Sequence, residues 1–269
     1  MNILFIGDIS GKPGRFMVRE YLPKIKEKYQ IDLTIADCEN AATGLGVTSK
    51  VLNELSGYGI DYFTAGDHIW HFSDFVEDLQ NKSLPIVRPY NYEGGKQIPG
   101  KAYDILDLGS KGKVVIACFL GQVYLPKDQR NPFWAADDFL AELEKQGIEF
   151  GKDIILLDIH AEATAEKINF ATYLKNKATA VVGTHTHVAT ADTRLLGTTA
   201  FVTDVGMTGP YDASLWIKLE QTIHNFKYPF KVRGEMEEGG SRVFNSVLIE
   251  TDEGRAKSIT RIDYIHPEL

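Results

Sequence analysis

The residues with the clearest chemical signature are two histidines, His185 and His187, which follow the apolar run 180–184. A short apolar run bounded by turn-forming or polar residues predicts a buried strand, so the histidines fall in the loop just beyond it. Open α/β sheets bind their ligands at this position. On an extended segment, side chains two positions apart point the same way, so both imidazoles are expected to reach one small volume, where they could bind a metal ion. Taken alone, the pair fits two polar loop histidines equally well.

Other side chains that can bind a metal lie at the same kind of position, the carboxyl end of a predicted strand. Five predicted strands end in this way, whereas unrelated polar residues would fall on loops and helix faces as often. His71, His224 and His266 lie outside the pattern, and we expect surface or packing roles for them. The residues within the pattern are Asp8, Glu39, Asn40, Asp67, His68, His160, His185 and His187.

The types of donor favour two metal ions. The set contains three carboxylates, one amide and three or four imidazoles, without a thiolate. That is more than one ion takes from a protein, and it suits two adjacent first-row ions that share a carboxylate. Two ions about 3.5–4 Å apart can hold a hydroxide, bind the oxygens of a phosphate ester and stabilise the charge that grows on the attacking and leaving oxygens. The residues therefore predict phosphoester hydrolysis.

Short apolar runs that alternate with longer amphipathic segments must position these residues. The alternation is typical of an α/β chain whose βα units wind into a largely parallel sheet. Segments 102–108 and 113–120 are expected to be antiparallel strands, and 243–250 with 257–264 a hairpin. Further strands are expected at 2–6, 33–37, 61–65, 84–87, 153–159, 180–184 and 199–202, and helices at 11–29, 48–58, 73–80, 132–146, 164–174 and 213–223.

Length and composition narrow the possible functions. With 269 residues, 43% of them hydrophobic, the chain is expected to form one domain, residues 1–269. The net charge of −8 argues against a surface that follows long nucleic acid but allows a small anionic substrate. No segment has the ~18 apolar residues of a membrane span or the pattern of a secretory leader, so a soluble cytoplasmic protein is expected. Cys38 and Cys118 are too few for a disulfide scaffold.

Other motifs carry less weight. The segment 7–12 lacks the glycine spacing of a phosphate-binding loop, and Gly44-x-Gly46 alone is poor evidence for a dinucleotide site. Lys12 and Arg15 could attract a substrate phosphate at a helix start, but a solvated helix end fits them as well. Packing is the simpler role for three aromatic residues that could stack on a base, Tyr90, Phe133 and Trp134.

The series of motifs resembles the calcineurin-like metallophosphoesterases, and specifically the bacterial YmdB-type phosphodiesterases. The similarity covers essentially the whole chain. It rests on Gly7-Asp8, Glu39-Asn40, Gly66-Asp67-His68, His160 and Gly183-Thr184-His185-Thr186-His187, and it extends to Arg88-Pro89-Tyr90-Asn91-Tyr92, Asn131-Pro132-Phe133 and Gly206-Met207-Thr208-Gly209-Pro210.

The resemblance implies a fold of mixed β-sheets flanked by helices and a role for each site residue. Glu39 would bridge two metal ions, and His68 would act as the general acid at the leaving oxygen. The family also implies hydrolysis of small cyclic nucleotides, 2′,3′-cyclic phosphates especially and 3′,5′-cyclic phosphates as a further class. The nucleophile would be a hydroxide held by two iron or manganese ions, with zinc as an alternative, and a homo-oligomer is implied. The first site would be completed by Asp8, Asn40 and His187, and the second site would be completed by Asp67, His160 and His185.

Two positions depart from the family pattern. The family reads Gly-Asn-His where this chain has Gly66-Asp67-His68. Our hypothesis is that Asp67 still binds the second ion, more tightly than an amide would, but leaves it a weaker Lewis acid, with an altered metal preference or lower turnover. Ser10 stands where the wider superfamily often has a histidine, and we expect Asn40 to fill that place.

Two other functions stay open at this point. A phosphomonoesterase or nuclease would use the same two ions. A regulatory protein that binds a metal or nucleotide would show only weak or incidental phosphoesterase activity, and Asp67 makes this alternative less remote. His68 favours the enzyme, because a binding protein has no need of a general acid.

Overall fold

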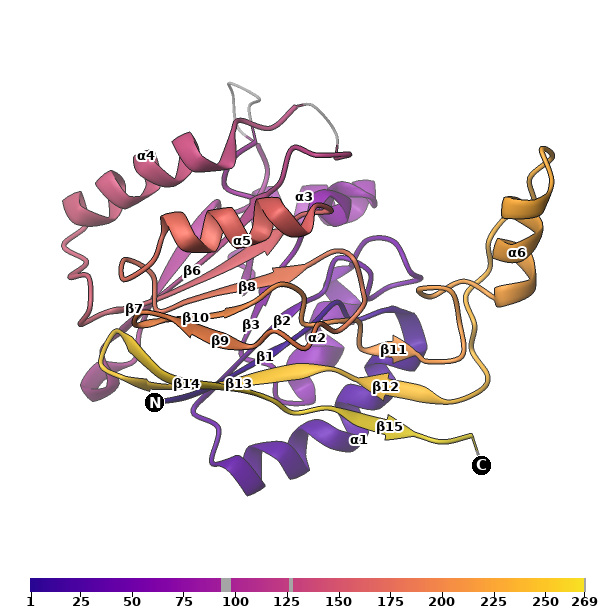
Figure 1. The fold of residues 1–269 in the computed structure, drawn as a ribbon, viewed down its shortest axis with the longest axis horizontal. Coiled ribbons are helices and arrows are strands. Elements are labelled where there is room, and N and C mark those ends of the chain that lie inside the picture. Colours follow the sequence, from indigo (N-terminus) through magenta and orange to yellow (C-terminus); the bar gives the residue numbers. More distant parts are fainter. Residues whose placement is uncertain (93–97, 126–127, 269) are drawn as a thin grey trace.

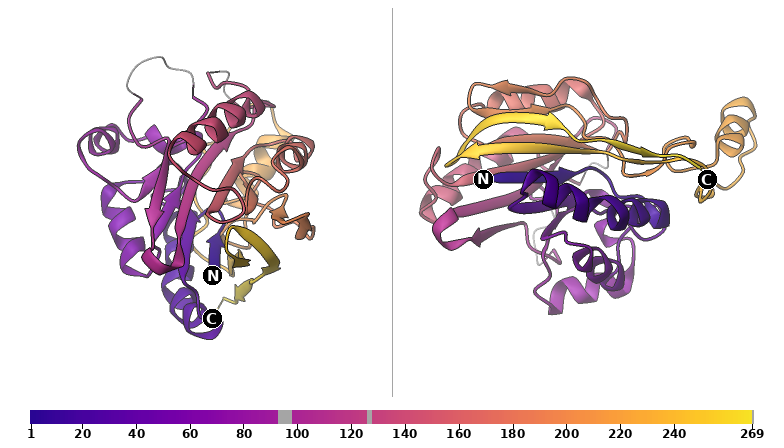
Figure 2. Two further views of the ribbon diagram at one scale, coloured as in Figure 1. Left: turned by 90° about the vertical axis from the view of Figure 1, so that its left-hand side faces the viewer. Right: turned by 90° about the horizontal axis from the view of Figure 1, so that it is seen from below.

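A computed structural model describes residues 1–92, 98–125 and 128–268. Two six-stranded sheets lie face to face, with helices on the outer face of each (Figures 1 and 2). The first sheet has the order β14 (Arg255–Arg261), β13 (Ser246–Asp252), β1 (Asn2–Ile6), β2 (Leu33–Asp37), β3 (Tyr62–Thr64) and β4 (Ile86–Val87). The second has the order β5 (Tyr103–Asp107), β6 (Lys113–Leu120), β7 (Ile154–His160), β8 (Ala180–Thr184), β10 (Thr199–Val202) and β9 (Arg194–Leu196).

The mixed sheets flanked by helices are confirmed, but the expectation of one largely parallel sheet is wrong. Each sheet has a parallel part, β1 to β4 in the first and β6, β7, β8 and β10 in the second. Antiparallel strands flank it on one side of the first sheet (β13 and β14) and on both sides of the second (β5 and β9). The expected pairing of β5 with β6 and the hairpin of β13 with β14 are confirmed. An apolar layer between the two sheets buries one face of each, so every central strand is covered on both sides. Strands that are covered on both faces have the same near-continuous apolar sequence, so the sequence does not show which sheet a strand joins.

The helices cover the outer faces in two groups. The first sheet is covered by α1 (Gly11–Tyr29), α2 (Ser49–Gly57) and α3 (Ser73–Asn81), and the second by α4 (Pro132–Lys145) and α5 (Thr164–Tyr173). Local chemistry sets where they begin. The Asn131 side chain accepts hydrogen bonds from the backbone N–H groups of Phe133 (2.9 Å) and Trp134 (3.4 Å), and Pro132 follows in the first turn.

The largest difference from expectation lies between residues 205 and 245. The helix expected at 213–223 is instead α6 (Leu219–Lys227), on an arm that extends from the body (Figure 2). Residues 214 and 217 pair as a β-bridge, which excludes a helix there. A three-stranded sheet of β11 (Gly209–Pro210), β12 (Arg242–Phe244) and β15 (Tyr264–His266) was not expected, and neither was β9. Among the residues that the structure describes, no helix is long and apolar enough to cross a membrane.

Parallel pairing places the carboxyl ends of β1, β2 and β3 at one edge of the first sheet and those of β7 and β8 at one edge of the second. The packing of the sheets brings these two edges together at one end of the fold (Figure 1). Two glycines allow this close approach. A Cβ atom at Gly7 would lie 1.8 Å from the carbonyl oxygen of Gly206, and one at Gly183 would lie 1.8 Å from that of Thr203. The strand ends therefore bring their polar residues to one place.

Candidate metal centre

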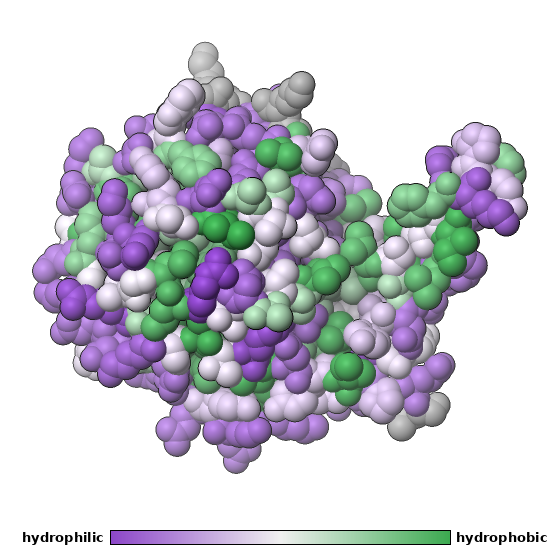
Figure 3. Space-filling view, viewed as in Figure 1, coloured by the Kyte–Doolittle hydropathy of each residue, from purple (hydrophilic) through white to green (hydrophobic). Residues whose placement is uncertain are grey.

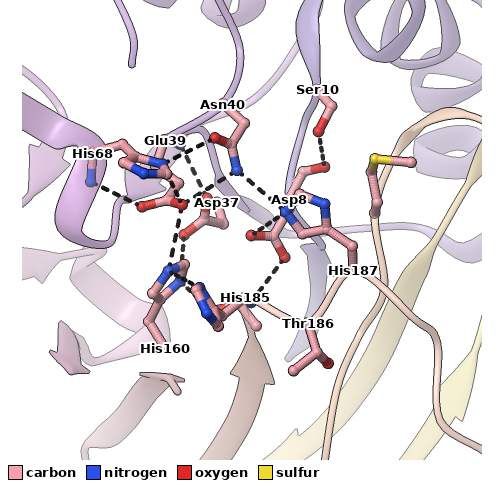
Figure 4. Close-up of polar contacts among 12 residues, drawn as sticks. Asp8, Ser10, Asp37, Glu39, Asn40, His68, His160, His185, Thr186 and His187 are labelled. Carbon is pink, nitrogen blue, oxygen red and sulfur yellow. Dashed lines mark hydrogen bonds and ion pairs between the residues drawn. The ribbon is translucent and has the colours of Figure 1, made fainter. Parts of the chain in front are cut away.

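All of the site residues expected from the strand ends lie together at this end of the fold, and Figure 4 shows most of them pointing toward one another. They come from β7 and from the segments that follow β1, β2, β3 and β8. Asp8, Glu39, Asn40 and His160 are buried, whereas Asp67, His68, His185 and His187 are partly exposed. The prediction that five strand ends converge is therefore confirmed in space, whereas the ligand roles remain predictions.

One group of four residues brings its donor atoms within 4.8 Å of one another: Glu39, Asp67, His160 and His185. His160 lies at its centre. The His160 Nε2 atom lies 3.4 Å from Glu39 Oε1, 3.6 Å from Asp67 Oδ1 and 3.1 Å from His185 Nδ1. This group matches the set expected for the second ion together with the bridging carboxylate.

The other expected set lies on the opposite side of Glu39. The His187 Nε2 atom lies 3.6 Å from Asp8 Oδ1 and 3.2 Å from the Asn40 amide nitrogen. That nitrogen also lies 3.2 Å from Glu39 Oε1. Glu39 therefore stands between the two sets, as a bridging ligand must.

Asp37 is a member of the cluster that sequence analysis missed. It ends β2, and its Oδ2 atom lies 3.8 Å from His160 Nδ1. Asp37, Asp8 and His160 form a second group whose possible ligand atoms lie within 4.8 Å of one another. Burial, and then the charges of Asp8 and Glu39, raise the pKa of Asp37 well above its usual range. The signal was present in its position at the end of the predicted strand 33–37, the same kind of position that marks the other site residues.

The loop that carries the two histidines has an unexpected backbone. Strand β8 ends at Thr184, and His185 and His187 adopt positive φ angles of 88° and 65°. The expectation that both rings converge because the segment is extended is therefore wrong. They still reach adjacent parts of the cluster. The backbone of both residues is in the left-handed region, which is uncommon for residues other than glycine and is held here by the surrounding structure.

A buried ion pair holds this loop. Lys167 on α5 lies 2.6 Å from Asp204 and donates a second hydrogen bond, of 2.5 Å, to the carbonyl oxygen of Thr184. The same Asp204 oxygen accepts hydrogen bonds from the backbone N–H (3.1 Å) and hydroxyl (2.6 Å) of Thr186. Thr186 is therefore anchored to Asp204 directly and Thr184 through Lys167, one on each side of His185.

His160 is oriented by a chain of buried hydrogen bonds. Its Nδ1 atom lies 2.9 Å from Thr184 Oγ1, which donates to Asp158 at 2.7 Å. The other oxygen of Asp158 accepts from Thr64 at 2.6 Å. Burial raises the pKa of Asp158 to about 6. Such contacts behind a metal-binding histidine fix its ring and leave the other nitrogen, here Nε2, to face the cluster.

His68 differs from the other histidines because its side chain is 35% exposed and lies at the rim. Its Nδ1 atom lies 3.2 Å from Glu39 Oε1 and 3.3 Å from the Asn40 amide oxygen. The hydrogen bond to Glu39 raises the pKa of His68, which favours the imidazolium form. Its Nε2 atom is 3.9 Å from the nearest Asp67 oxygen.

The charges in the cluster are strongly coupled. Burial alone would raise the pKa of Glu39, but the charges and hydrogen bonds of His160 and His68 together outweigh it and hold that pKa well below the usual range. Burial lowers the pKa of His160, yet Glu39 and Asp67 outweigh it, and the net pKa is well above the ordinary value. Burial and the adjacent His160 lower the pKa of His185. Opposite shifts of this kind, in one small volume, are typical of functional sites.

The cluster fits metal ions by two structural observations. Buried Asp8 Oδ1, Asp67 Oδ1 and His187 Nδ1 have no hydrogen-bond partner among the described residues, although polar atoms in such positions normally have one. In addition, four carboxylates are packed within one cluster, an arrangement that needs compensating positive charge. Carboxylate, amide and imidazole donors suit first-row ions.

Gly66 makes room for the cluster. A Cβ atom at this position would lie 2.4 Å from Glu39 Oε2 and 2.4 Å from the ring of His160. The segment that carries Asp67 and His68 can therefore approach the bridging carboxylate only because residue 66 has no side chain.

The other candidates have ordinary structural roles. Arg15 donates to the carbonyl oxygen of Ala41 at 2.6 Å and pairs with Glu54 at 3.1 Å, so it fixes a loop. Lys12 forms an exposed ion pair with Glu238. Tyr90 and Phe133 pack among aromatic rings, and Trp134 is exposed on α4. Cys38 and Cys118 are buried, and neither forms a disulfide within the described part of the chain.

Comparisons with known proteins agree with this geometry. A family model described as "YmdB-like protein" matches residues 4–262. The 2′,3′-cyclic-nucleotide 2′-phosphodiesterase of Bacillus subtilis is 43% identical over 263 residues, which cover 96% of this chain and 94% of the relative. A crystal structure of a novel phosphatase from Mycoplasma pneumoniae has a TM-score of 0.90 at 30% identity and covers 100% of this chain and 94% of its own. The NAD nucleotidase of Haemophilus influenzae shares the fold, with a TM-score of 0.59 at 17% identity over 99% of this chain and 56% of its own.

Proposed function

Because the chain belongs to the YmdB-like family of calcineurin-like metallophosphoesterases, we propose that it is a metal-dependent phosphodiesterase that hydrolyses small cyclic nucleotides. The Bacillus subtilis relative is named for 2′,3′-cyclic nucleotides, and these are the proposed main substrates. 3′,5′-Cyclic nucleotides are a second proposed class. The observation that carries the proposal is the position of Glu39 between two sets of donors, with orphaned carboxylate and imidazole atoms around it.

We propose the following roles for the residues of the cluster. Glu39 would bind both metal ions. Two further sets of three would complete the sites, Asp8, Asn40 and His187 for the first ion and Asp67, His160 and His185 for the second. Iron and manganese are the expected ions, with zinc as an alternative, as the family resemblance implies, and the oxygen and nitrogen donors suit all three. When bound, such a pair supplies an activated water and neutralises charge on the phosphate oxygens.

The chain's own contribution to bond cleavage is His68. Its Nδ1 atom faces Asn40 and Glu39, so Nε2 is the nitrogen free to point toward a substrate at the rim. A proton on Nε2 passes to the ribose oxygen as its bond to phosphorus breaks, and this neutralises the leaving group. The partial exposure of His68 lets it exchange that proton with solvent between turnovers.

Other residues keep the reacting groups in place. Asp158 and Thr184 orient His160, and the ion pair of Lys167 with Asp204 fixes the loop that carries the remaining histidines. Asp37 lies behind His160, 3.8 Å from its Nδ1 atom, and adds a further carboxyl group to the cluster. A cytoplasmic setting is part of the proposal and suits a chain with two free cysteines.

The test combines metal analysis with substrate assays on one sample. The protein is purified without added metal, its iron, manganese and zinc are quantified, and it is assayed against 2′,3′-cyclic nucleotides, 3′,5′-cyclic nucleotides and a phosphomonoester. We expect about two ions per chain and cleavage of the diesters in preference to the monoester. The control is Glu39→Gln, which should lose the bridging charge, bound metal and turnover together.

Two outcomes would contradict the proposal. Preferential hydrolysis of the monoester would assign a phosphomonoesterase. One ion or none, with no hydrolysis after metal is supplied but with measurable nucleotide binding, would assign a regulatory protein instead.

A further inference from the structure

Glu162 is a carboxylate at the edge of the metal centre that has no role in the cleavage step. It lies in the short segment between β7 and α5, two residues after His160. Its Oε2 atom lies 3.1 Å from Nε2 of His185, the distance of a hydrogen bond from an imidazole N–H to a carboxylate. In the described part of the chain, this nitrogen has no other hydrogen-bond or ion-pair partner.

The two ring nitrogens of His185 have different surroundings. Nδ1 lies 3.1 Å from Nε2 of His160, and Figure 4 shows the two rings beside each other. Two nitrogen atoms that bind one ion at about 2.0–2.1 Å lie about 3 Å apart, so this pair has the spacing of two ligands of the same ion. The remaining nitrogen, Nε2, faces Glu162. His185 therefore lies between the cluster on one side and a carboxylate on the other.

The position of one proton decides whether His185 can bind an ion at the cluster. A neutral imidazole carries a single N–H, and only the other nitrogen has a lone pair for a metal. With the proton on Nδ1, the ring could not bind at the cluster, and the lone pair of Nε2 would face a carboxylate. An ionised carboxylate only accepts hydrogen bonds, so Glu162 favours the proton on Nε2 and leaves Nδ1 free.

The fold fixes the backbone on either side of Glu162. β7 ends at His160, whose backbone pairs with β8. α5 follows within a few residues, and its buried Lys167 anchors this helix to the loop that carries His185. Ala161, inside the connecting segment, is fully buried. The carboxylate is therefore presented to the ring of His185 from a short connection between two anchored elements.

His187, the histidine expected at the first ion, has no such partner. Its Nε2 atom lies 3.6 Å from Asp8 Oδ1, and its Nδ1 atom is buried without a hydrogen-bond partner among the described residues. His187 also borders a cavity of about 370 Å³ that is lined mainly by apolar side chains such as Val188 and Met207. Figure 3 shows hydrophobic residues in this region, where the arm meets the body. The histidines of the two expected sets therefore differ in their surroundings.

We propose that Glu162 is a positioning residue that holds the proton of His185 on Nε2, so that Nδ1 faces the second metal ion and binds it more tightly. The inference rests on the metal sites of the proposed function. A carboxylate behind a metal-binding histidine fixes the ring and raises its basicity, and loss of such a partner typically weakens metal binding about 10–100-fold. The effect should fall on the second ion, because the carboxylate contacts a histidine of that site.

The alternative is an exposed ion pair without a further role. The side chains of Glu162 and His185 are 47% and 22% exposed, and ion pairs near the surface often contribute little. The two possibilities make different predictions. An ion pair without a role would leave metal affinity unchanged when Glu162 is replaced, whereas a positioning residue would change that affinity through His185.

The first experiment measures metal affinity by titration calorimetry with Mn²⁺ on protein freed of metal by chelation. We expect two ions per chain in the unaltered protein. Glu162→Ala should weaken binding of one ion by about 10–100-fold and leave the affinity for the other unchanged. Glu162→Gln should give a smaller loss, because an amide oxygen accepts the hydrogen bond without the charge. The matched control is Glu149→Ala, at an exposed glutamate paired with Lys152, and it should keep both affinities.

The second experiment tests whether Glu162 acts through His185. In a His185→Ala background, Glu162→Ala should cause no further loss of metal affinity. In a His187→Ala background, it should cause the full loss at the site that remains. In zinc-loaded protein, NMR should show an Nε2–H proton on His185 that is shifted downfield and protected from exchange by its hydrogen bond, and both features should disappear in Glu162→Ala.

The outcomes separate this inference from the proposed function. Two bound ions with unchanged affinities in Glu162→Ala would overturn the inference and leave the proposed function standing. A loss that persists undiminished in the His185→Ala background would also overturn the inference, because Glu162 would then act on the metal directly. Fewer than two ions in the unaltered protein, with metal in excess, would overturn the proposed function and with it the inference that rests on it.

Discussion

Lys167→Met tests whether the buried ion pair with Asp204 holds the histidine loop in its left-handed conformation. Lys167 and Asp204 are 1% and 0% exposed, and their charged atoms are 2.6 Å apart. Methionine keeps the apolar stem of lysine but removes the charge and the hydrogen bond to Thr184. The substitution therefore leaves a buried carboxylate without its cation.

The expected loss of stability follows from that geometry. Removing one partner of a buried ion pair costs about 3–5 kcal/mol. Asp204 keeps hydrogen bonds from Thr186 and Gly206, which partly support its charge, so we expect the lower end, about 3 kcal/mol. For a chain of this size, that corresponds to a fall in melting temperature of roughly 6–12 °C. A loosened loop should also weaken metal binding by about 10–100-fold, as for other residues that support metal ligands.

The assay combines urea unfolding with metal titration of the unloaded protein. The control is Lys152→Met, which removes a pair with Glu149 of similar length, 2.8 Å, in which both side chains are more than 60% exposed. It should change stability by less than about 0.5 kcal/mol. The double variant Lys167→Met, Asp204→Asn should recover part of the stability because it removes the unpaired charge. If Lys167→Met were as stable as the control variant and bound metal with unchanged affinity, the reasoning would be refuted.

Three further predictions concern the cluster itself. Asp67→Asn should weaken binding of the second ion and raise turnover at saturating metal, and equal metal affinity and equal rates would exclude a special role for this carboxylate. His68→Ala should lower turnover by about 10²–10⁴-fold with metal content retained. The control His71→Ala, at an exposed histidine, should leave kcat unchanged. Loss of metal in His68→Ala would show that His68 is a metal ligand and not the general acid. Gly66→Ala should reduce metal content and activity, because the added Cβ atom would lie 2.4 Å from Glu39 and His160. The control Gly57→Ala, whose Cβ atom would have nothing within 4 Å, should be neutral or raise stability by up to about 1 kcal/mol. Full metal content in Gly66→Ala would show that the segment can shift.

Local patterns in the sequence were enough to place most elements and most site residues. Strands β1, β2, β6 and β10 and helix α1 have the bounds that their apolar periodicity predicts. Asp8, Glu39 and His160 could be found because a strand end is a local feature, and the parallel direction of neighbouring strands then brings such ends to one edge. Both signals depend only on residues close together in the chain.

Tertiary structure decided what depends on distant partners. The division into two sheets depends on which apolar face meets which, and the strands that form them are apolar on both faces. The positive φ angles of His185 and His187 are held by Lys167 and Asp204, which lie 17 or more positions from the residues they anchor. The start of α6 was misplaced because residue 217 pairs with residue 214 and also with residue 236 on the returning chain, so this stretch does not enter a helix. A backbone conformation that is imposed by contacts from elsewhere in the chain leaves no periodicity in the sequence. The sequence alone therefore predicted which residues form the cluster, and only the folded chain determined how their side chains are oriented.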